Sequence, residues 1–166
     1  MGGGLARNPA RPEPEPGPPT LEEGRTMHRT SARNQLRGTV TSVRQGVANS
    51  LVTIDVDGTE VKADVMTEDV DELGLAPGVP ATAIFRPTSV MIVTDDVAVS
   101  ARNRLRGTIR VVEKGSVNGL VRVALPGGQQ VESQVTLGSI NRLHLVEGKA
   151  VTAVVKATDV VVAVDD

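Results

Sequence analysis

The chain is 166 residues long and carries 18 basic against 20 acidic residues, a formal net charge of −2. This balance gives no overall positive field for a nucleic acid backbone. The absence of cysteine excludes disulfides and thiolate metal sites. The single aromatic residue, Phe85, leaves bases, sugars or flavins without a stacking platform. No apolar run approaches the roughly 20 residues of a membrane-spanning helix, so the sequence predicts a cytoplasmic protein without nucleic acid or membrane partners.

Residues 1–30 are predicted to be a disordered tail. Six of the ten prolines fall in this segment, which has almost no apolar residues. Ordering it would cost about 1–2 kcal/mol per residue, with little burial to offset that cost. The tail is therefore not expected to belong to the fold.

The remainder of the chain consists of two tandem copies of one repeat unit. The segment SARNQLRGTVTSVRQG, which begins at Ser31, reappears as SARNRLRGTIRVVEKG from Ser100. The similarity continues through both copies, with one extra residue around the Gly127-Gly128 turn. A tandem repeat of this length predicts two domains, residues 31–97 and residues 98–166.

Each copy shows mostly the two-residue period of β-strands. In the first copy, strands are expected around residues 36–43, 51–56 and 61–65, and the Asp57-Gly58 pair favours a hairpin. A short helix is expected over 67–73, ended by Gly74, and two strands over 81–85 and 90–93. The sequence therefore predicts an all-β fold of two tandem five-stranded barrels of the oligonucleotide/oligosaccharide-binding (OB) type, each with one short helix. Because each unit buries little core, we expect the copies to pack on each other and on neighbouring chains.

Catalysis is not predicted. His28 lies in the tail and His144 in only one copy, so no histidine is placed to activate a nucleophile in both copies. Carboxylates such as Asp55 and Asp64 lie at strand or turn positions that are expected to be solvated. OB-type barrels bind single strands by stacking bases on aromatic side chains, which this chain lacks. The chain is therefore expected not to be an enzyme.

Recurring cations and hydroxyls favour a small anion as the ligand. Ser-Ala-Arg-Asn precedes the first strand of both copies, and a late strand ends on Arg86 in one copy and on Lys156 in the other. In the second copy, Thr136 and Ser139 bring hydroxyls to a predicted helix N-terminus, where free N–H groups favour negative charge. Taken singly, each residue also fits an ordinary structural role. Together these donors suit a tetrahedral oxyanion, without a metal or a general base.

The SARNQLRG opening, the LGL-x-x-G turn and the strand end VVKATDVVV resemble the molybdenum-pterin-binding-protein (Mop) or TOBE family, over about residues 28–166. The resemblance implies intracellular binding, storage and homeostasis of molybdate, and also of tungstate, as an intact oxyanion. It implies a homo-oligomer, with a trimer favoured, whose sites lie between domains and subunits. No cofactor is implied besides this ligand. The alternative is a regulatory module in which the anion controls docking to another protein.

The resemblance also implies which residues bind the oxyanion. They are Ser31, Arg33, Ser100, Arg102, Thr136, Ser139, Lys156 and Arg86. The first copy departs from the family pattern, because Met66 and Asp69 stand where the second copy has Thr136 and Ser139. Met66 cannot donate a hydrogen bond, and Asp69 would repel a dianion or pair with Arg86. Pockets with Thr136, Ser139 and Lys156 are thus the predicted main sites, which Ser31 and Arg33 from the other copy or another subunit would complete. The sequence does not fix which Ser-Ala-Arg-Asn motif faces which helix. Cavity size would select against sulfate.

Overall fold

The computed structural model describes residues 28–165, so nearly all of the predicted tail lies outside the described residues. The first copy forms β1 (Asn34–Arg44), β2 (Asn49–Val56), β3 (Thr59–Met66), α1 (Thr67–Glu72), β4 (Pro80–Phe85), the 3-10 turn η1 (Pro87–Ser89) and β5 (Met91–Val93). The second copy forms β6 (Asn103–Lys114), β7 (Asn118–Ala124), β8 (Gln130–Thr136), α2 (Leu137–Arg142), β9 (Ala150–Val155), η2 (Ala157–Asp159) and β10 (Val161–Ala163). The predicted five strands and one short helix per copy are confirmed.

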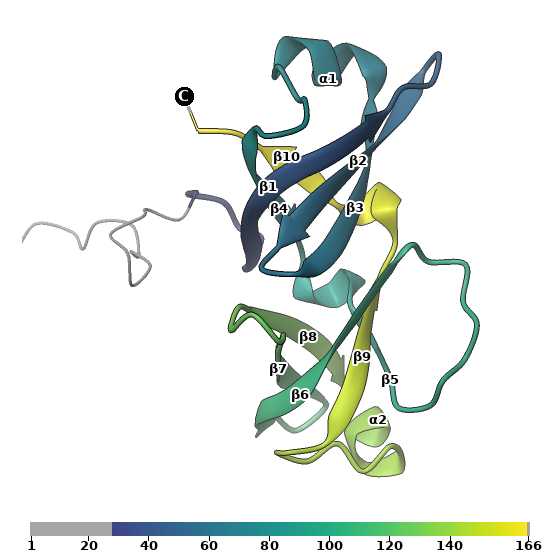
Figure 1. Cartoon of the computed structure of the whole chain (residues 1–166). Coiled ribbons are helices and arrows are strands. Elements are labelled where there is room, and N and C mark those ends of the chain that lie inside the picture. Colours follow the sequence, from purple (N-terminus) through teal and green to yellow (C-terminus); the bar gives the residue numbers. More distant parts are fainter. Residues whose placement is uncertain (1–27, 166) are drawn as a thin grey trace, which may run out of the picture.

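The strands form two five-stranded antiparallel sheets (Figure 1). The first sheet has the order β10-β4-β1-β2-β3 and the second has the order β5-β9-β6-β7-β8. Each sheet thus contains the last strand of the other copy. Val161 of β10 lies opposite Ile84 of β4, and Met91 of β5 lies opposite Val154 of β9.

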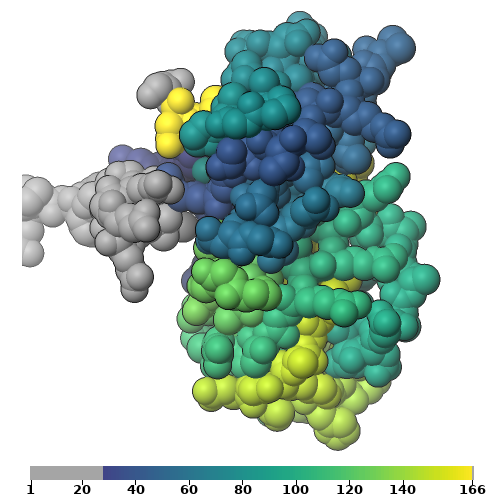
Figure 2. Space-filling model, viewed as in Figure 1, coloured from purple at the N-terminus to yellow at the C-terminus, as the bar shows by residue number. Residues whose placement is uncertain are grey.

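This exchange joins the two halves of the chain. The expected boundary near residue 97 separates the two repeats of the sequence, but the sheets do not follow it. Figure 2 shows the yellow end of the chain within the blue upper lobe, which belongs to the first copy. Because each exchanged strand covers an edge of a sheet built by the other copy, it satisfies backbone groups that would otherwise be exposed.

A single hydrophobic cluster runs through both sheets. Its fully buried members include Leu36 and Ile54 from the first copy and Leu105 and Ile109 from the second. Phe85, the aromatic residue of the chain, is also buried in this cluster. Since neither half closes a core alone, the two sheets are expected to unfold together.

Two buried asparagines tie the copies together. Asn34 at the start of β1 donates from Nδ2 to the Glu132 carbonyl oxygen at 2.8 Å and accepts from the Glu132 N–H at 2.7 Å. Asn103 at the start of β6 does the same with Lys62 of β3, at 2.7 and 2.6 Å. Both side chains are about 1% exposed. The last residue of each Ser-Ala-Arg-Asn motif therefore bonds to the backbone of the other copy, a role that the sequence analysis did not assign.

Gly107 lies where β6 crosses close to the end of β7. A Cβ at this position would overlap the carbonyl oxygen of Ala124. We therefore expect Gly107→Ala to lower the free energy of unfolding by about 1–3 kcal/mol, because the neighbouring strand must shift. Urea unfolding followed by circular dichroism measures this change.

Gly138 in α2 provides the matched control. A Cβ there would meet only the Thr136 hydroxyl, at 3.9 Å, and alanine favours a helix over glycine. Gly138→Ala should thus leave stability unchanged or raise it slightly. Equal loss of stability in both variants would show that the close approach of β7 to Gly107 is not the reason why Gly107→Ala is destabilising.

Candidate anion-binding site

A cavity of about 500 Å³ lies between the second copy and the β1–β2 turn of the first copy. Ser100 and Arg102, from the segment that precedes β6, line one part of it. Lys156, which follows β9 and leads into η2, lines another part. Residues 44–46 and 49–51 of the first copy face them. The structure therefore brings together three of the eight predicted ligands within one chain.

The cavity has an excess of positive charge. Arg44, Arg102 and Lys156 line it together with one carboxylate, Asp64, so three cations against one anion leave an excess of two positive charges. The Oδ1 atom of Asp64 accepts a hydrogen bond from Asn49 Nδ2 at 2.9 Å. Within residues 28–165, neither Arg102 nor Lys156 forms an ion pair. Both are free to make charge-assisted hydrogen bonds to a dianion.

Hydrogen bonds of two hydroxyl groups stabilise the β1–β2 turn on the first-copy side of the cavity. Ser50, which is 2% exposed, lies with its Oγ 2.8 Å from the Thr67 Oγ1. The Thr67 hydroxyl donates to the Gly46 carbonyl oxygen at 2.9 Å. The start of α1 thereby fixes the turn that carries Arg44. Sequence reasoning missed Arg44 and Ser50, because neither recurs in the other copy and neither lies at a predicted helix N-terminus.

The predicted helix start in the second copy is present, but it lies outside the cavity that contains Lys156. Thr136 is the N-cap of α2, where its Oγ1 accepts from the Ser139 N–H at 3.1 Å and lies 3.0 Å from the Ser139 hydroxyl. Neither residue lines the cavity that contains Lys156. Figure 1 shows α2 at the end of the second sheet remote from the η2 turn. One chain alone does not bring Thr136, Ser139 and Lys156 into this cavity.

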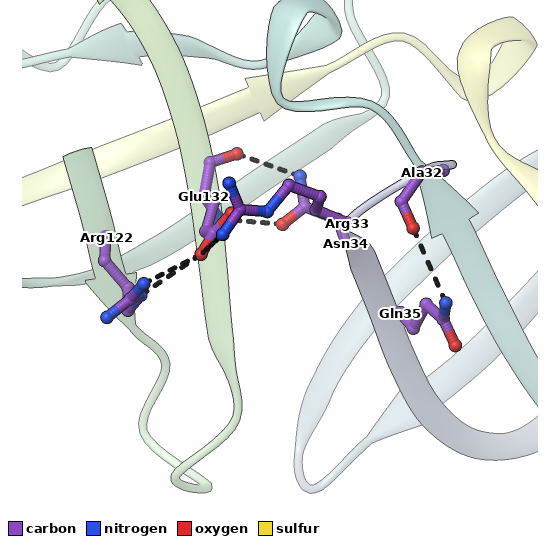
Figure 3. Close-up of polar contacts among 6 residues, drawn as sticks. All are labelled: Ala32, Arg33, Asn34, Gln35, Arg122 and Glu132. Atoms are coloured by element: carbon purple, nitrogen blue, oxygen red, sulfur yellow. Dashed lines mark hydrogen bonds and ion pairs between the residues drawn. The ribbon is translucent and has the colours of Figure 1, made fainter. Parts of the chain in front are cut away.

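The first Ser-Ala-Arg-Asn motif has different surroundings. Ser31 and Arg33 are exposed, and Arg33 Nε lies 3.0 Å from Glu132 Oε2 (Figure 3). Arg86, at the position equivalent to Lys156, is also exposed. No ion pair joins it to Asp69 in the described part of the chain, so the pairing considered for these two residues is not observed. These residues do not line the cavity around Lys156.

The histidines contribute to neither location. His28 belongs to the described fold and not to the tail, because its N–H donates to Gln35 Oε1 at 2.9 Å and its Nε2 lies 3.5 Å from Asp165 Oδ1. His144 is exposed, with a φ of 50°, at the turn that follows α2. Residues 28–165 contain no group of three or more acidic or histidine side chains that could hold a metal ion. In the same part of the chain, no helix has the length and apolar character needed to cross a bilayer.

The fold and cavity together define a two-domain β protein with a cationic recess of the kind that suits a small anion. The TOBE domain profile matches residues 30–92 and again residues 99–162, and the chain belongs to this family. The resemblance noted in the sequence is thereby confirmed.

Several relatives have informative names. The molybdenum transport protein ModE of Herbaspirillum seropedicae is 38% identical over 143 residues, which cover 84% of this chain and 53% of that protein. The molybdenum-pterin-binding protein MopA of Rhodobacter capsulatus is 36% identical, over 81% of this chain and 52% of its own length. The chain thus spans about half the length of these curated relatives.

A solved structure extends the comparison. The cytoplasmic molybdate-binding protein ModG, with molybdate bound, superposes with a TM-score of 0.80 at 36% identity, covering 83% of this chain and 100% of that one. The two-domain arrangement is therefore shared along the full length of a molybdate-binding relative. None of these relatives is named for catalysis.

Proposed function

We propose that this protein binds molybdate as an intact oxyanion and serves in its storage and homeostasis inside the cell. One observation carries the proposal. Arg102, Lys156 and Ser100 line one cavity with an excess of positive charge, in a chain whose relatives are named for molybdate or molybdenum-pterin binding. The cytoplasmic relative ModG supports the location. Tungstate, which has the same charge and shape, is the second expected ligand.

Binding needs no chemical step. The guanidinium of Arg102 and the ammonium of Lys156 would donate charge-assisted hydrogen bonds to the oxyanion, each stronger than a bond between neutral groups. The exposed hydroxyl of Ser100 adds a neutral donor. Asp64 accepts a hydrogen bond from Asn49, and its carboxylate would repel an anion that binds away from Arg102 and Lys156. Selection between molybdate and sulfate would come from the size of the closed cavity, because both are tetrahedral dianions.

The cavity is larger than its ligand. A volume of about 500 Å³ would hold on the order of fifteen water molecules, whereas the oxyanion has only five heavy atoms. Further groups must therefore close it around the anion. We propose that a neighbouring copy supplies them in a homo-oligomer, with a trimer favoured, and that Thr136 and Ser139 of the neighbour add their hydroxyls. Ser31, Arg33 and Arg86 would form a second, separate location.

Titration calorimetry of the full chain with molybdate, tungstate, sulfate and phosphate tests the proposal. We expect molybdate and tungstate to bind at least about a hundredfold more tightly than sulfate, which corresponds to about 2.7 kcal/mol. Phosphate, which carries a proton at neutral pH, should bind weakly because the cavity offers mostly donors. Equal affinity for molybdate and sulfate would refute the function.

Anion-controlled docking to another protein is the second candidate. The similarity to ModE supports it, because that relative is about twice as long as the matched segment and carries further sequence. Pull-down of a purified partner by the full chain, with and without molybdate, separates the two functions. Association that depends on molybdate would favour regulation. Association that is the same with and without molybdate would leave storage as the function.

A further inference from the structure

The arginines of the two Ser-Ala-Arg-Asn motifs have different partners. Arg33 Nε lies 3.0 Å from Glu132 Oε2, and its Nη2 lies 3.5 Å from Glu132 Oε1 (Figure 3). Arg102 has no ion-pair partner within the described residues. The repeat makes the two arginines equivalent in sequence, but only one of them is engaged by a carboxylate.

Glu132 is held firmly in place. Arg122 lies opposite it in the β7–β8 register and donates to Glu132 Oε1 from Nη2 at 2.9 Å and from Nε at 3.3 Å. Its backbone N–H and carbonyl are both bonded to Asn34. Its side chain is only 13% exposed. The Arg33 side chain is 63% exposed, but it faces a largely buried carboxylate that Arg122 and Asn34 hold in place.

The first copy has the opposite charge at the equivalent place. Asn103 bonds to the backbone of Lys62 just as Asn34 bonds to that of Glu132. Thr53 lies opposite Lys62 in the β2–β3 register, where the second copy has Arg122. The position beside the Arg102 motif therefore has a cation, and the position beside the Arg33 motif has a carboxylate.

We propose that Glu132 is a specificity-determining residue that weakens oxyanion binding at the location around Arg33. This inference rests on the proposed function. A dianion that approaches Arg33 meets a carboxylate that already uses the guanidinium, so it must break an ion pair or accept a like charge nearby. The Arg102–Lys156 cavity also has one carboxylate in its lining, but Asp64 accepts from Asn49 and, within the described residues, pairs with neither Arg102 nor Lys156. The two copies have thus diverged, and the strong oxyanion site of each chain is the one built on the second motif.

Glu132→Gln is the direct test, with molybdate as the probe in titration calorimetry of the full chain. Glutamine keeps the side-chain size and the backbone bonds to Asn34, and it removes the charge that holds Arg33. We expect the variant to bind one additional molybdate per chain, or to bind its weaker class of sites at least about tenfold more tightly. The affinity of the Arg102–Lys156 cavity should stay within about twofold of that of the unaltered protein.

The reciprocal exchange controls for a merely structural effect. The double variant Thr53→Arg with Lys62→Glu places the second-copy pair beside Arg102, and it should weaken the strong site by about tenfold or more. Lys62→Gln, which removes only a cation, should weaken it less. If Glu132→Gln fails to fold, the reciprocal variant alone decides.

The outcomes separate the two proposals. Unchanged stoichiometry and affinity in folded Glu132→Gln, or unaltered binding by the reciprocal variant, would overturn the role of Glu132 while leaving molybdate binding intact. An unaltered protein that binds molybdate no better than sulfate would instead overturn the proposed function, and this inference with it.

Discussion

Lys156→Ala is expected to weaken molybdate binding by about 10- to 100-fold. Lys156 lines the cavity beside Arg102 and has no ion-pair partner among residues 28–165. Its ammonium is therefore available to the oxyanion, and a hydrogen bond to a charged group contributes about 1.5–3 kcal/mol. The side chain is exposed in the free chain, so its removal should change the free energy of unfolding by less than about 0.5 kcal/mol. Titration calorimetry measures the affinity.

Arg86→Ala is the matched control for this prediction. Arg86 occupies the equivalent position in the first copy, is also exposed, and does not line the cavity. Its removal should change the affinity of the strong site by less than about threefold. A larger loss for Arg86→Ala than for Lys156→Ala would show that the strong site is built on the first copy and not on the second.

Asn103→Ala should destabilise the protein by roughly 2–5 kcal/mol. The substitution leaves the N–H and the carbonyl of Lys62 without their side-chain partner. A buried polar group left unsatisfied costs about 1–3 kcal/mol, and Asn103 serves two such groups. Because Arg102 is the adjacent residue, molybdate affinity should fall as well. Urea unfolding gives the stability, and Asn34→Ala should behave alike through Glu132.

An exposed asparagine provides the comparison. Asn141 lies on α2 and forms no side-chain hydrogen bond within the described residues, so Asn141→Ala should leave the free energy of unfolding within about 0.5 kcal/mol. Should Asn103→Ala unfold at the same urea concentration as Asn141→Ala, the asparagines do not hold the two copies together.

The repeat and the strand periods predicted most of the fold, but not the exchange of strands. Residues 90–93 have a strand pattern, and the structure places a strand at Met91–Val93. Alternation of apolar residues shows which face of a strand is buried, but not which sheet it joins. The equivalent strand of the second copy, Val161–Ala163, is equally short and apolar. Either could pair with β4 or β9, so only the path of the chain after η1 and η2 decides.

Comparison of the two copies predicts those residues of the candidate site that have an equivalent in both. The repeat predicts Ser100, Arg102 and Lys156 as ligands, and the structure places them around one cavity. Arg44 and Ser50 on its opposite side are found in one copy only, so comparison of the copies could not find them. Asn34 and Asn103 recur, but they belong to a motif that also contains Ser and Arg. The motif is therefore interpreted as anion-binding, and the structural role of its asparagine is not predicted.

The location of bound molybdenum tests the central claim most directly. Crystals of the full chain grown with molybdate would reveal the metal through its anomalous scattering. The account predicts a molybdenum peak in the Arg102–Lys156 cavity, with oxygens within hydrogen-bond distance of both side chains. Molybdenum found beside Arg33 and Arg86, with that cavity empty of it, would contradict the account.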